Sequence, residues 1–350
     1  MSVTVNADVG GESESILEVV DVCKEFPLQQ GLLQRALRPG RKVVALDHVD
    51  LTVSQGDILG LVGESGSGKS TLAHVILRLL PVTSGRIRYR GQDITWLERG
   101  DLRPFRERVQ MVFQDTQSSL NPRKTVGQAL VDPLRIRGVP TRERIGHAVG
   151  LLEQVGLDPH FMGRYPHELS GGQRQRVGIS RALAMHPEFL IADEPVSSLD
   201  VSLQAQILNL LLKLREDLGL TMVLVSHDLA IVNHISSRVA VMYAGRVVEV
   251  GRPSEVLQAP AHPYTQALRA SVPEGLEGRR KAKEPLAGDP PDPTNLPQGC
   301  RFVTRCRQAM AICREEYPPA IRLSATHLAE CHLLTRATSL AVEQGPLKGA

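Results

Sequence analysis

Two glycine-rich loops with the chemistry to bind phosphate lie far apart in this chain of 350 residues. The first follows an apolar run, Ile58 to Val62, that is typical of a buried parallel strand. It precedes Leu72 to Leu80, a segment with helical apolar spacing. A strand, a Gly-rich turn and a helix together are the context of a P-loop with the pattern GxxxxGKS/T. The loop consists of Gly63, Glu64, Ser65, Gly66, Ser67, Gly68, Lys69, Ser70 and Thr71.

The residue types of this loop suit the binding of a nucleoside triphosphate. Gly63, Gly66 and Gly68 lack side chains, so backbone N–H groups can wrap the phosphates, and the helix N-terminus adds roughly half a positive charge. We expect Lys69 to reach the β- and γ-phosphates and the Ser70 hydroxyl to bind Mg²⁺. A glycine-rich surface turn is the alternative interpretation, and the complete pattern in this context disfavours it.

The second loop, Leu169-Ser-Gly-Gly-Gln173, opens a helix that we expect to begin near Arg174. Ser170 resembles an N-cap, and Gly171 and Gly172 leave backbone N–H groups uncovered. These features predict a second phosphate-binding helix terminus. A plain Ser-capped helix is the alternative, which the pentapeptide by itself leaves open.

Two carboxylates follow another apolar run, Phe189 to Ala192. A buried strand there would deliver Asp193 and Glu194 to the carboxyl edge of the sheet, where open α/β folds bind ligands. We expect Asp193 to hold Mg²⁺ directly or through water, and Glu194 to orient and polarise an attacking water. A strand that ends in solvated acids is the alternative, and the P-loop upstream in the same sheet favours function.

The elements that must position these residues alternate between strand and helix, which indicates an α/β protein. Residues from about Thr95 to Met185 have mainly helical periodicity and predict a helical subdomain. An amphipathic helix is expected where one stripe carries Leu203, Ile207, Leu210, Leu211, Leu214 and Leu218. Strands are expected at Ile16 to Phe26, Lys42 to Val53, Arg86 to Gly91, Thr221 to Val225 and Val239 to Tyr243, with an inserted loop at Leu28 to Arg41.

The amino-acid composition changes after about Ala259, where prolines recur and a Cys-containing tail follows. The expected organisation is a flexible N-terminal tail at 1–15, an ATPase domain at 16–258, a Pro-rich linker at 259–299 and a small C-terminal module at 300–350. The densest basic run, Arg279 to Lys283, falls in the linker and is expected to be solvated.

Charge and hydropathy restrict the function classes. A net charge of +3 is slight, so composition implies neither a nucleic-acid nor an anionic-membrane partner. The N-terminus has no signal pattern, and no stretch approaches the ~20 apolar residues that cross a bilayer. We therefore expect a soluble, cytoplasmic protein, for which any membrane role must come through a partner.

With these motifs the chain resembles the ATP-binding subunits of ABC transporters, from about Ile16 to Leu268. The resemblance implies a P-loop NTPase fold: a RecA-like core sheet, a helical subdomain, an N-terminal antiparallel β part, and here a Cys-containing C-terminal module. It also implies ATP and Mg²⁺ as ligands, with catalytic roles for Glu194, His227 and Gln114. The matching motifs are Gln114 for the Q-loop, which senses Mg²⁺ and the γ-phosphate, Ser198-Leu-Asp200 for the D-loop, His227 for the switch histidine, and Phe26 for the aromatic that stacks on adenine.

In that family the signature loop of one subunit caps the ATP held by the P-loop of another, which implies a head-to-tail dimer. Ser118 to Arg123, Tyr165 to Gln173 and His262 to Leu268 resemble the dipeptide and oligopeptide importers. The inserted loop and Arg123 resemble the second of their two unlike ATPase subunits. The implied partners are a sister ATPase, two integral membrane permease subunits and, indirectly, an extracellular solute-binding protein. Nickel and glutathione importers share these motifs.

Four of the five cysteines gather near the C-terminus: Cys300, Cys306, Cys313 and Cys331. A cytosolic chain seldom forms structural disulfides, and no pair has the C-x₂-C spacing of common zinc ribbons. The spacing resembles the C-terminal extension of peptide-importer ATPases, some of which hold a 4Fe–4S cluster, for which four thiolates suffice. Structural zinc and unligated thiols are the alternatives. A metal would compensate for the small core of so short a module.

Two other function classes remain to be weighed. Soluble ABC ATPases that act on ribosomes or DNA usually carry two cassettes or a very long coiled-coil insertion, and this chain has neither. A nucleotide-binding regulator without hydrolysis is disfavoured because Glu194 and His227 are both present.

Overall fold

The computed structural model describes residues 14–28, 42–98, 100–114, 119–271 and 288–335. Several predicted features lie wholly or partly outside these residues. They are most of the N-terminal tail (1–13), the inserted loop (29–41), Asp115 and Ser118 beside the Q-loop, the basic run of Arg279 to Lys283, and the last residues of the C-terminal module (336–350).

The central sheet has eight strands, in the order β11-β12-β10-β9-β3-β8-β7-β6. The five strands from β9 to β6 run parallel, and β10, β12 and β11 continue the sheet in antiparallel pairing. The strands are β3 (Ile58–Val62), β6 (Val109–Val112), β7 (Phe189–Asp193), β8 (Thr221–Val225), β9 (Arg238–Tyr243), β10 (Arg246–Gly251), β11 (Ala320–Arg322) and β12 (Leu328–Glu330).

A second, antiparallel sheet has the order β2-β1-β4-β5. Its strands are β1 (Ser15–Pro27), β2 (Lys42–Ser54), β4 (Ser84–Tyr89) and β5 (Gln92–Asp93). The strand at Arg86 to Gly91, which we expected to continue the P-loop sheet, is instead β4 of this second sheet.

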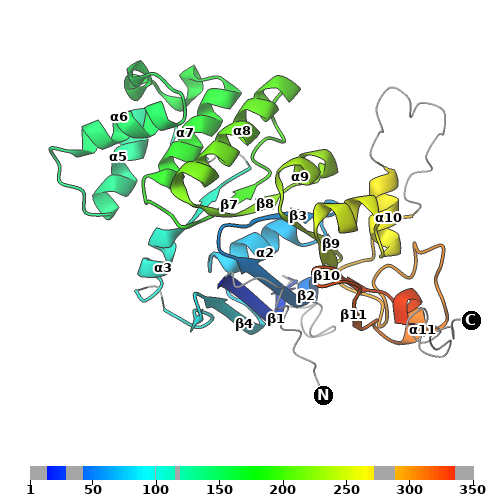
Figure 1. The fold of residues 1–350 in the computed structure, drawn as a ribbon. Helices are drawn as coiled ribbons and strands as arrows, with labels where there is room; N and C mark the ends of the chain where they lie inside the picture. Colours follow the sequence, from blue (N-terminus) through cyan, green and yellow to red (C-terminus); the bar gives the residue numbers. More distant parts are fainter. Residues whose placement is uncertain (1–13, 29–41, 99, 115–118, 272–287, 336–350) are drawn as a thin grey trace, which may run out of the picture.

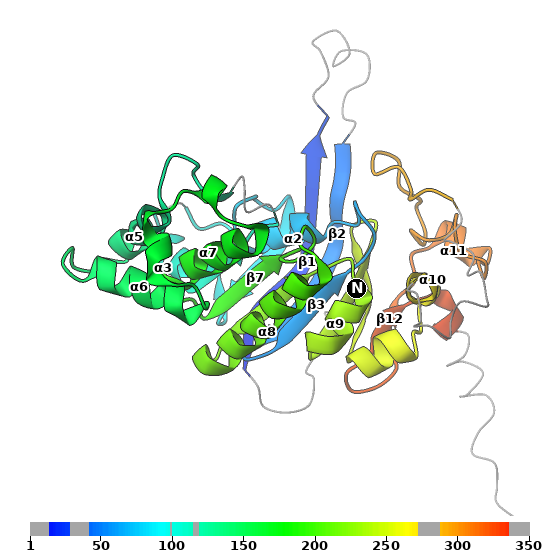
Figure 2. The same ribbon diagram turned by 90° about the horizontal axis from the view of Figure 1, so that it is seen from above.

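Two groups of helices lie at opposite ends of the molecule, with α2 and α9 between them (Figure 1). Helices α5, α6 and α7 gather at one end, and the C-terminal region with α10 and α11 lies at the other end, as the view from above also shows (Figure 2). The helices are α2 (Lys69–Ile76), α3 (Arg103–Arg108), α5 (Val126–Ile136), α6 (Arg144–Gln154), α7 (Gly171–Leu183), α8 (Val201–Leu218), α9 (Leu229–Ile235), α10 (Pro263–Ala270) and α11 (Ile312–Glu315). Short turns of other helix types span Pro159–Gly163, Pro166–Glu168 and Ser254–Gln258.

The core lies on both faces of the central sheet. Along β3, Ile58 and Val62 belong to one cluster of buried side chains, and Leu59 and Leu61 belong to the other. All five residues of the strand are buried, as a parallel strand covered on both faces requires. The α/β P-loop fold with a helical subdomain and an antiparallel β part is therefore confirmed.

Several elements differ from the sequence-based expectation, among them β6, α10, β11 and β12. Strand β6 lies within the stretch predicted to be helical. The sequence did not reveal it, because four residues are too few to show the alternation of a strand. Helix α10 lies within the range predicted to be a linker, with Pro263 at its first turn, where proline is tolerated. Strands β12 and β11 of the C-terminal module join the central sheet through β10. Among the described residues, no helix combines the length and apolarity needed to span a bilayer.

Candidate active site

The P-loop connects β3 to α2 at the carboxyl edge of the parallel strands. Gly68, at the N-cap of α2, has a φ of 106°, and a Cβ there would lie 2.7 Å from the Ala45 carbonyl oxygen. Gly63 has a φ of 151°, and a Cβ there would lie 2.2 Å from the Met242 carbonyl oxygen. Glycine at both positions therefore allows the loop to pack directly on neighbouring backbone.

Lys69 is buried within the curl of this loop. Its Nζ donates hydrogen bonds of 2.8 Å to the carbonyl oxygens of both Gly63 and Glu64. Burial lowers the pKa of the ammonium, and the nearby carboxylates of Glu194, Asp193 and Glu64 oppose that effect. An anionic phosphate would stabilise the buried charge further, as the P-loop assignment requires.

Ser70 and Asp193 form the oxygen pair expected for Mg²⁺. The Ser70 hydroxyl donates to Asp193 Oδ1 over 3.2 Å. Burial raises the pKa of Asp193, because its carboxylate is removed from water at the end of β7. Hydroxyl and carboxylate oxygens are hard ligands that suit Mg²⁺, so the residues present fit the ion.

Glu194 lies at the centre of three predicted catalytic residues. Its Oε2 accepts a hydrogen bond of 2.8 Å from Gln114 Nε2, and its Oε1 is 3.2 Å from His227 Nδ1. The backbone of Glu194 has a φ of 43°, in the left-handed region that non-glycine residues seldom adopt. Such backbone strain concentrates at functional sites. The structure thus brings together residues that lie just after the carboxyl ends of β6, β7 and β8 and are far apart in sequence.

The second loop, Leu169 to Gln173, matches the signature loop of the family, and its Ser170 caps α7 as the sequence predicted. Ser170 Oγ accepts from the Gln173 N–H, and Gln173 Oε1 accepts from the Ser170 N–H, so the pair forms a capping box. A Cβ added to Gly171 would lie 3.2 Å from a Leu199 methyl, which places the loop beside the D-loop. Within the described part of the chain, the hydrogen bonds of Ser170 and Gln173 do not reach the P-loop.

Asp200 and Phe26 have more limited contacts. Asp200 caps α8, with Oδ1 accepting from the Leu203 N–H over 2.9 Å, and the next residue, Val201, is highly exposed. Phe26 is half-buried near the end of β1, and Lys24 Nζ lies 4.9 Å from its ring centroid. Strand β2, which pairs with β1, also backs the P-loop at Ala45. Phe26 therefore lies one strand away from the loop.

Sequence reasoning missed two residues that bind the P-loop from the C-terminal side. Arg305 holds the Glu64 carboxylate through two bonds, Nη1 to Oε2 at 2.7 Å and Nη2 to Oε1 at 3.0 Å. These bonds raise the pKa of Arg305. Tyr264 Oη accepts from the Glu64 N–H over 2.8 Å. Arg305 is 241 residues from Glu64, so no local pattern reveals the pair.

The four C-terminal cysteines line one small pocket together with His332. Burial raises the pKa of Cys300 to about 11, and it also raises the pKa of the Cys306 and Cys331 thiols. Among the described residues, the only trio of His, Cys or carboxylate ligand atoms that all lie within 4.8 Å of one another is that of Cys23, Asp47 and His48. The four sulfurs therefore face a shared space but are spread more widely than that.

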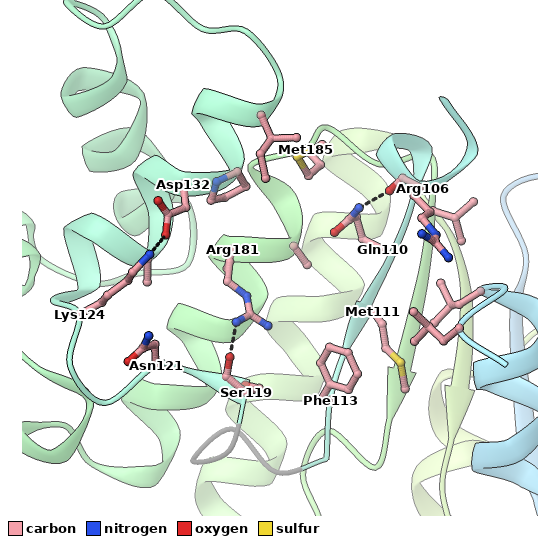
Figure 3. A pocket seen from close by; sticks show the side chains of 17 residues that line it. Arg106, Gln110, Met111, Phe113, Ser119, Asn121, Lys124, Asp132, Arg181 and Met185 are labelled. Atoms are coloured by element: carbon pink, nitrogen blue, oxygen red, sulfur yellow. Dashed lines mark hydrogen bonds and ion pairs between the residues drawn. The ribbon is translucent and has the colours of Figure 1, made fainter. Parts of the chain in front are cut away.

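A groove of about 480 Å³ lies between the central sheet and the helical subdomain (Figure 3). Its wall carries Met111 and Phe113 from the segment that leads to Gln114, and Ile136 and Met185 from the helical side. An ion pair of Lys124 with Asp132 and a hydrogen bond from Arg181 to the Ser119 carbonyl support the rim. Leu79 and Ile136 are each more than half exposed at this groove.

Two family models match the chain. The model described as ABC transporter matches residues 46–197, and the model described as the oligopeptide/dipeptide transporter C-terminal region matches residues 248–313. The first range contains the P-loop, the Q-loop, the signature loop and both carboxylates. The second contains α10, Arg305 and three of the four cysteines.

Curated relatives are similar over nearly the whole chain. The oligopeptide transport ATP-binding protein AppF of Bacillus subtilis is 48% identical over 324 residues, which cover 91% of this chain and 98% of that protein. The "Probable peptide ABC transporter ATP-binding protein y4tS" of Sinorhizobium fredii is 45% identical, over 95% of this chain and 94% of that protein.

A solved structure shows the same arrangement of the cassette. The dimeric, post-hydrolysis ATP-binding cassette MJ0796 bound to ADP and Pi superimposes with a TM-score of 0.60 and is 30% identical. The superposition covers 68% of this chain and 98% of the MJ0796 chain. The geometry of the site and these similarities agree: the chain belongs to the ABC transporter family, as an ATP-hydrolysing subunit with the C-terminal region of the oligopeptide/dipeptide branch.

Proposed function

We propose that this protein couples ATP hydrolysis to the import of dipeptides or oligopeptides through a membrane transporter. The observation that carries the proposal is the convergence of Gln114, Glu194 and His227 beside Lys69 and Asp193, in a chain that resembles peptide-transport ATPases along most of its length. Its place would be at the inner face of the membrane as a peripheral subunit.

The proposed chemistry follows from the residues of the site. Lys69 would bind the β- and γ-phosphates, and the uncovered N–H groups of the P-loop would hold the remaining phosphate oxygens. Ser70 and Asp193, with Gln114, would hold Mg²⁺, which neutralises charge on the phosphates. Glu194 would orient and polarise the attacking water, while His227 would hydrogen-bond the γ-phosphate.

The second phosphate-binding loop would serve a different nucleotide. Ser170, Gly171, Gly172 and Gln173 would cap the ATP held by a partner ATPase, with Asp200 near the same interface. Within the described residues this loop bonds only to its own helix, which leaves it available for such a partner. The partner would be a sister ATPase of the same importer, and closing of the pair on ATP would supply the mechanical step. Phe26 would stack on the adenine.

The groove beside the Q-loop is the proposed contact with an integral membrane permease subunit. Its lining is partly apolar, it exposes Leu79 and Ile136, and it is continuous with the strand that leads to Gln114. A partner bound in this groove would be displaced by any movement of Gln114 toward the nucleotide. An extracellular solute-binding protein would deliver the peptide to the permease.

The cysteine pocket is the proposed site of a 4Fe–4S cluster, held by Cys300, Cys306, Cys313 and Cys331. Four thiols that share a pocket fit the ligand set of such a cluster. Tetrahedral zinc, with Zn–S bonds of about 2.3 Å, would need the sulfurs closer together than they are, so zinc is the second choice. The group would act structurally, by linking four segments of a short module. Anaerobic purification should give a brown protein with iron and sulfide, whereas a colourless protein with stoichiometric zinc would refute the cluster.

The transport proposal is tested by uptake in cells that lack this subunit. Restoring the wild-type chain should restore uptake of labelled di- and oligopeptides, and restoring the Glu194→Gln chain should not. Uptake of nickel or glutathione in place of peptides would reject peptide import while leaving the ATPase assignment intact. Co-purification of a ribosome or DNA, with no membrane subunit, would reject the transporter role.

A further inference from the structure

One residue of the P-loop, Glu64, is held by the C-terminal region through its side chain and its backbone. Arg305 grips the carboxylate with both Nη atoms, at 2.7 and 3.0 Å. The Arg305 side chain is only 4% exposed, so water screens this ion pair weakly. Bidentate arginine–carboxylate pairs are among the stronger and more directional contacts in proteins.

The backbone of Glu64 is fixed in the same place. Its N–H donates to Tyr264 Oη over 2.8 Å, and its carbonyl oxygen accepts from Lys69 Nζ over 2.8 Å. Tyr264 is fully buried and packs against Tyr243 and Phe302, at ring-centroid distances of 4.5 and 5.5 Å. Glu64 thus links Lys69 of the P-loop directly to Tyr264 and the aromatic rings packed on it.

A second arginine makes a parallel connection behind the P-loop. Arg301 Nη2 lies 2.6 Å from Asp47 Oδ2, and both side chains are nearly buried. The Asp47 N–H bonds the Gly245 carbonyl oxygen, and the Gly245 N–H bonds the Ser67 carbonyl oxygen, each over 2.9 Å. Each of the two arginines is next to a cysteine of the pocket: Arg301 comes directly after Cys300, and Arg305 comes directly before Cys306.

We infer that Arg305 is a positioning residue of the P-loop, and that through its pair with Glu64 the four-cysteine pocket and the nucleotide site are energetically coupled. The inference rests on the nucleotide site of the proposed function and not on the identity of any metal. Arg305 has two effects on that site. It fixes the strand-side half of the P-loop, and it neutralises a carboxylate that would otherwise repel phosphate oxygens.

Coupling of this kind is reciprocal. If an ordered cysteine pocket favours nucleotide binding by keeping Arg305 in place, then bound nucleotide must stabilise the pocket by the same factor. Changes at the pocket, such as loss of a bound metal or modification of a thiol, would then weaken nucleotide binding without touching the P-loop itself.

The first test compares nucleotide affinities of the full chain by titration with a fluorescent ATP analogue. Arg305→Ala should weaken binding about tenfold, because it leaves the Glu64 carboxylate unpaired beside the phosphates. Arg305→Lys should recover part of the loss, since it restores the charge but not the two-pronged geometry. Adding Glu64→Gln to Arg305→Ala should cause no further loss, because the two residues act as one unit.

The matched control is Arg314→Ala. Arg314 is exposed and also adjoins a cysteine of the pocket, Cys313, so it controls for removal of an arginine charge from this region. It should bind nucleotide like the wild type. Equal nucleotide affinity of Arg305→Ala and wild type would overturn the inference. So would a loss of affinity in the double variant that equals the sum of the losses in the Arg305→Ala and Glu64→Gln single variants.

The second test measures the reciprocal effect at the cysteines. A thiol reagent is applied with and without MgATP, and the modification rates of Cys300 and Cys306 are read by peptide mass spectrometry. MgATP should slow modification in the wild type and in Arg314→Ala by several-fold, and it should give no protection in Arg305→Ala at saturating nucleotide. The comparison works with or without a metal, because a resident metal only shifts the baseline rate. Protection that survives in Arg305→Ala, or is absent in the wild type, would refute the coupling.

Discussion

Burial disfavours the charged forms of two groups in the nucleotide site. It shifts the pKa of Lys69 and of Asp193 toward the neutral form of each. Phosphate and Mg²⁺ together would offset this cost of burial. The site is therefore arranged for a ligand that carries both signs, as a magnesium nucleotide does.

Glu194→Gln should separate nucleotide binding from hydrolysis. The amide keeps the hydrogen-bonding size of the side chain but cannot polarise water, so turnover should fall about a hundredfold or more. ATP affinity should stay near that of the wild type, and an ATP-bound dimer with the partner ATPase should accumulate. Phosphate release and size-exclusion chromatography measure the two effects; unchanged turnover would reject the assigned role.

Lys69→Ala, unlike Glu194→Gln, should weaken the binding of ATP itself. It removes the buried cation from the curl of the P-loop, so ATP affinity should fall at least about tenfold. Isothermal titration with the non-hydrolysing Glu194→Gln background gives the affinity without turnover. Wild-type affinity in the Lys69→Ala chain would contradict the P-loop assignment.

Residues on short contiguous motifs could be predicted from the sequence, and residues that act across the chain could not. The P-loop, the Asp193–Glu194 pair and the Ser170 cap each follow a local pattern that a fixed physical constraint produces. Arg305 has no such pattern, because its partner is 241 residues away. Its sequence position shows only that Arg305 directly precedes Cys306 of the C-terminal cysteine cluster.

At the scale of elements, helix termini and strand lengths decided which predictions held. The Ser170 cap of α7 was predicted, since capping chemistry is local, but α2 and α7 begin at Lys69 and Gly171, ahead of the expected Leu72 and Arg174. Strands β6, β11 and β12 were missed, because four, three and three residues carry too little alternation to distinguish them from loop. Their pairing comes from the sheet that surrounds them.

The N-terminus of α10 predicts a specific pH dependence of stability. His262 caps this helix, with Nδ1 accepting from the Tyr264 N–H over 3.0 Å, and burial lowers the pKa of the imidazole to about 4. The unfolded chain takes up a proton near pH 6.5, well above the folded chain. The unfolded state therefore binds more protons between those values, and stability falls as the pH drops through this window, by up to about 1.4 kcal/mol per pH unit.

His262→Asn isolates this contribution. Asparagine can cap the helix but does not titrate, so the variant should lose less stability than the wild type between pH 7 and pH 5. Urea unfolding at several pH values measures the difference. Parallel stability curves for the two proteins would show that His262 does not carry the effect.

At the scale of the whole molecule, the groove near the Q-loop is the proposed point where the membrane partner engages. Ile136→Glu should leave ATP binding by the isolated chain unchanged but should uncouple ATP hydrolysis from transport in the assembled importer, because it places a charge on the apolar wall. Ile145→Glu is the matched control, since Ile145 is similarly exposed on α6 and does not line the groove. Uptake in reconstituted vesicles is the readout, and equal uptake by both variants would reject the groove as the contact.

The junction of the C-terminal region with the central sheet has a consequence for solubility. Strand β12 pairs with β10, and the three-residue β11 then forms the outermost strand. Without these two strands, β10 would present its unpaired N–H and C=O groups to solvent, and such an open edge recruits other chains. A chain cut before residue 288 should therefore aggregate by edge-to-edge association even if its P-loop is intact. In this respect the C-terminal region would protect the edge of the ATPase sheet from other chains.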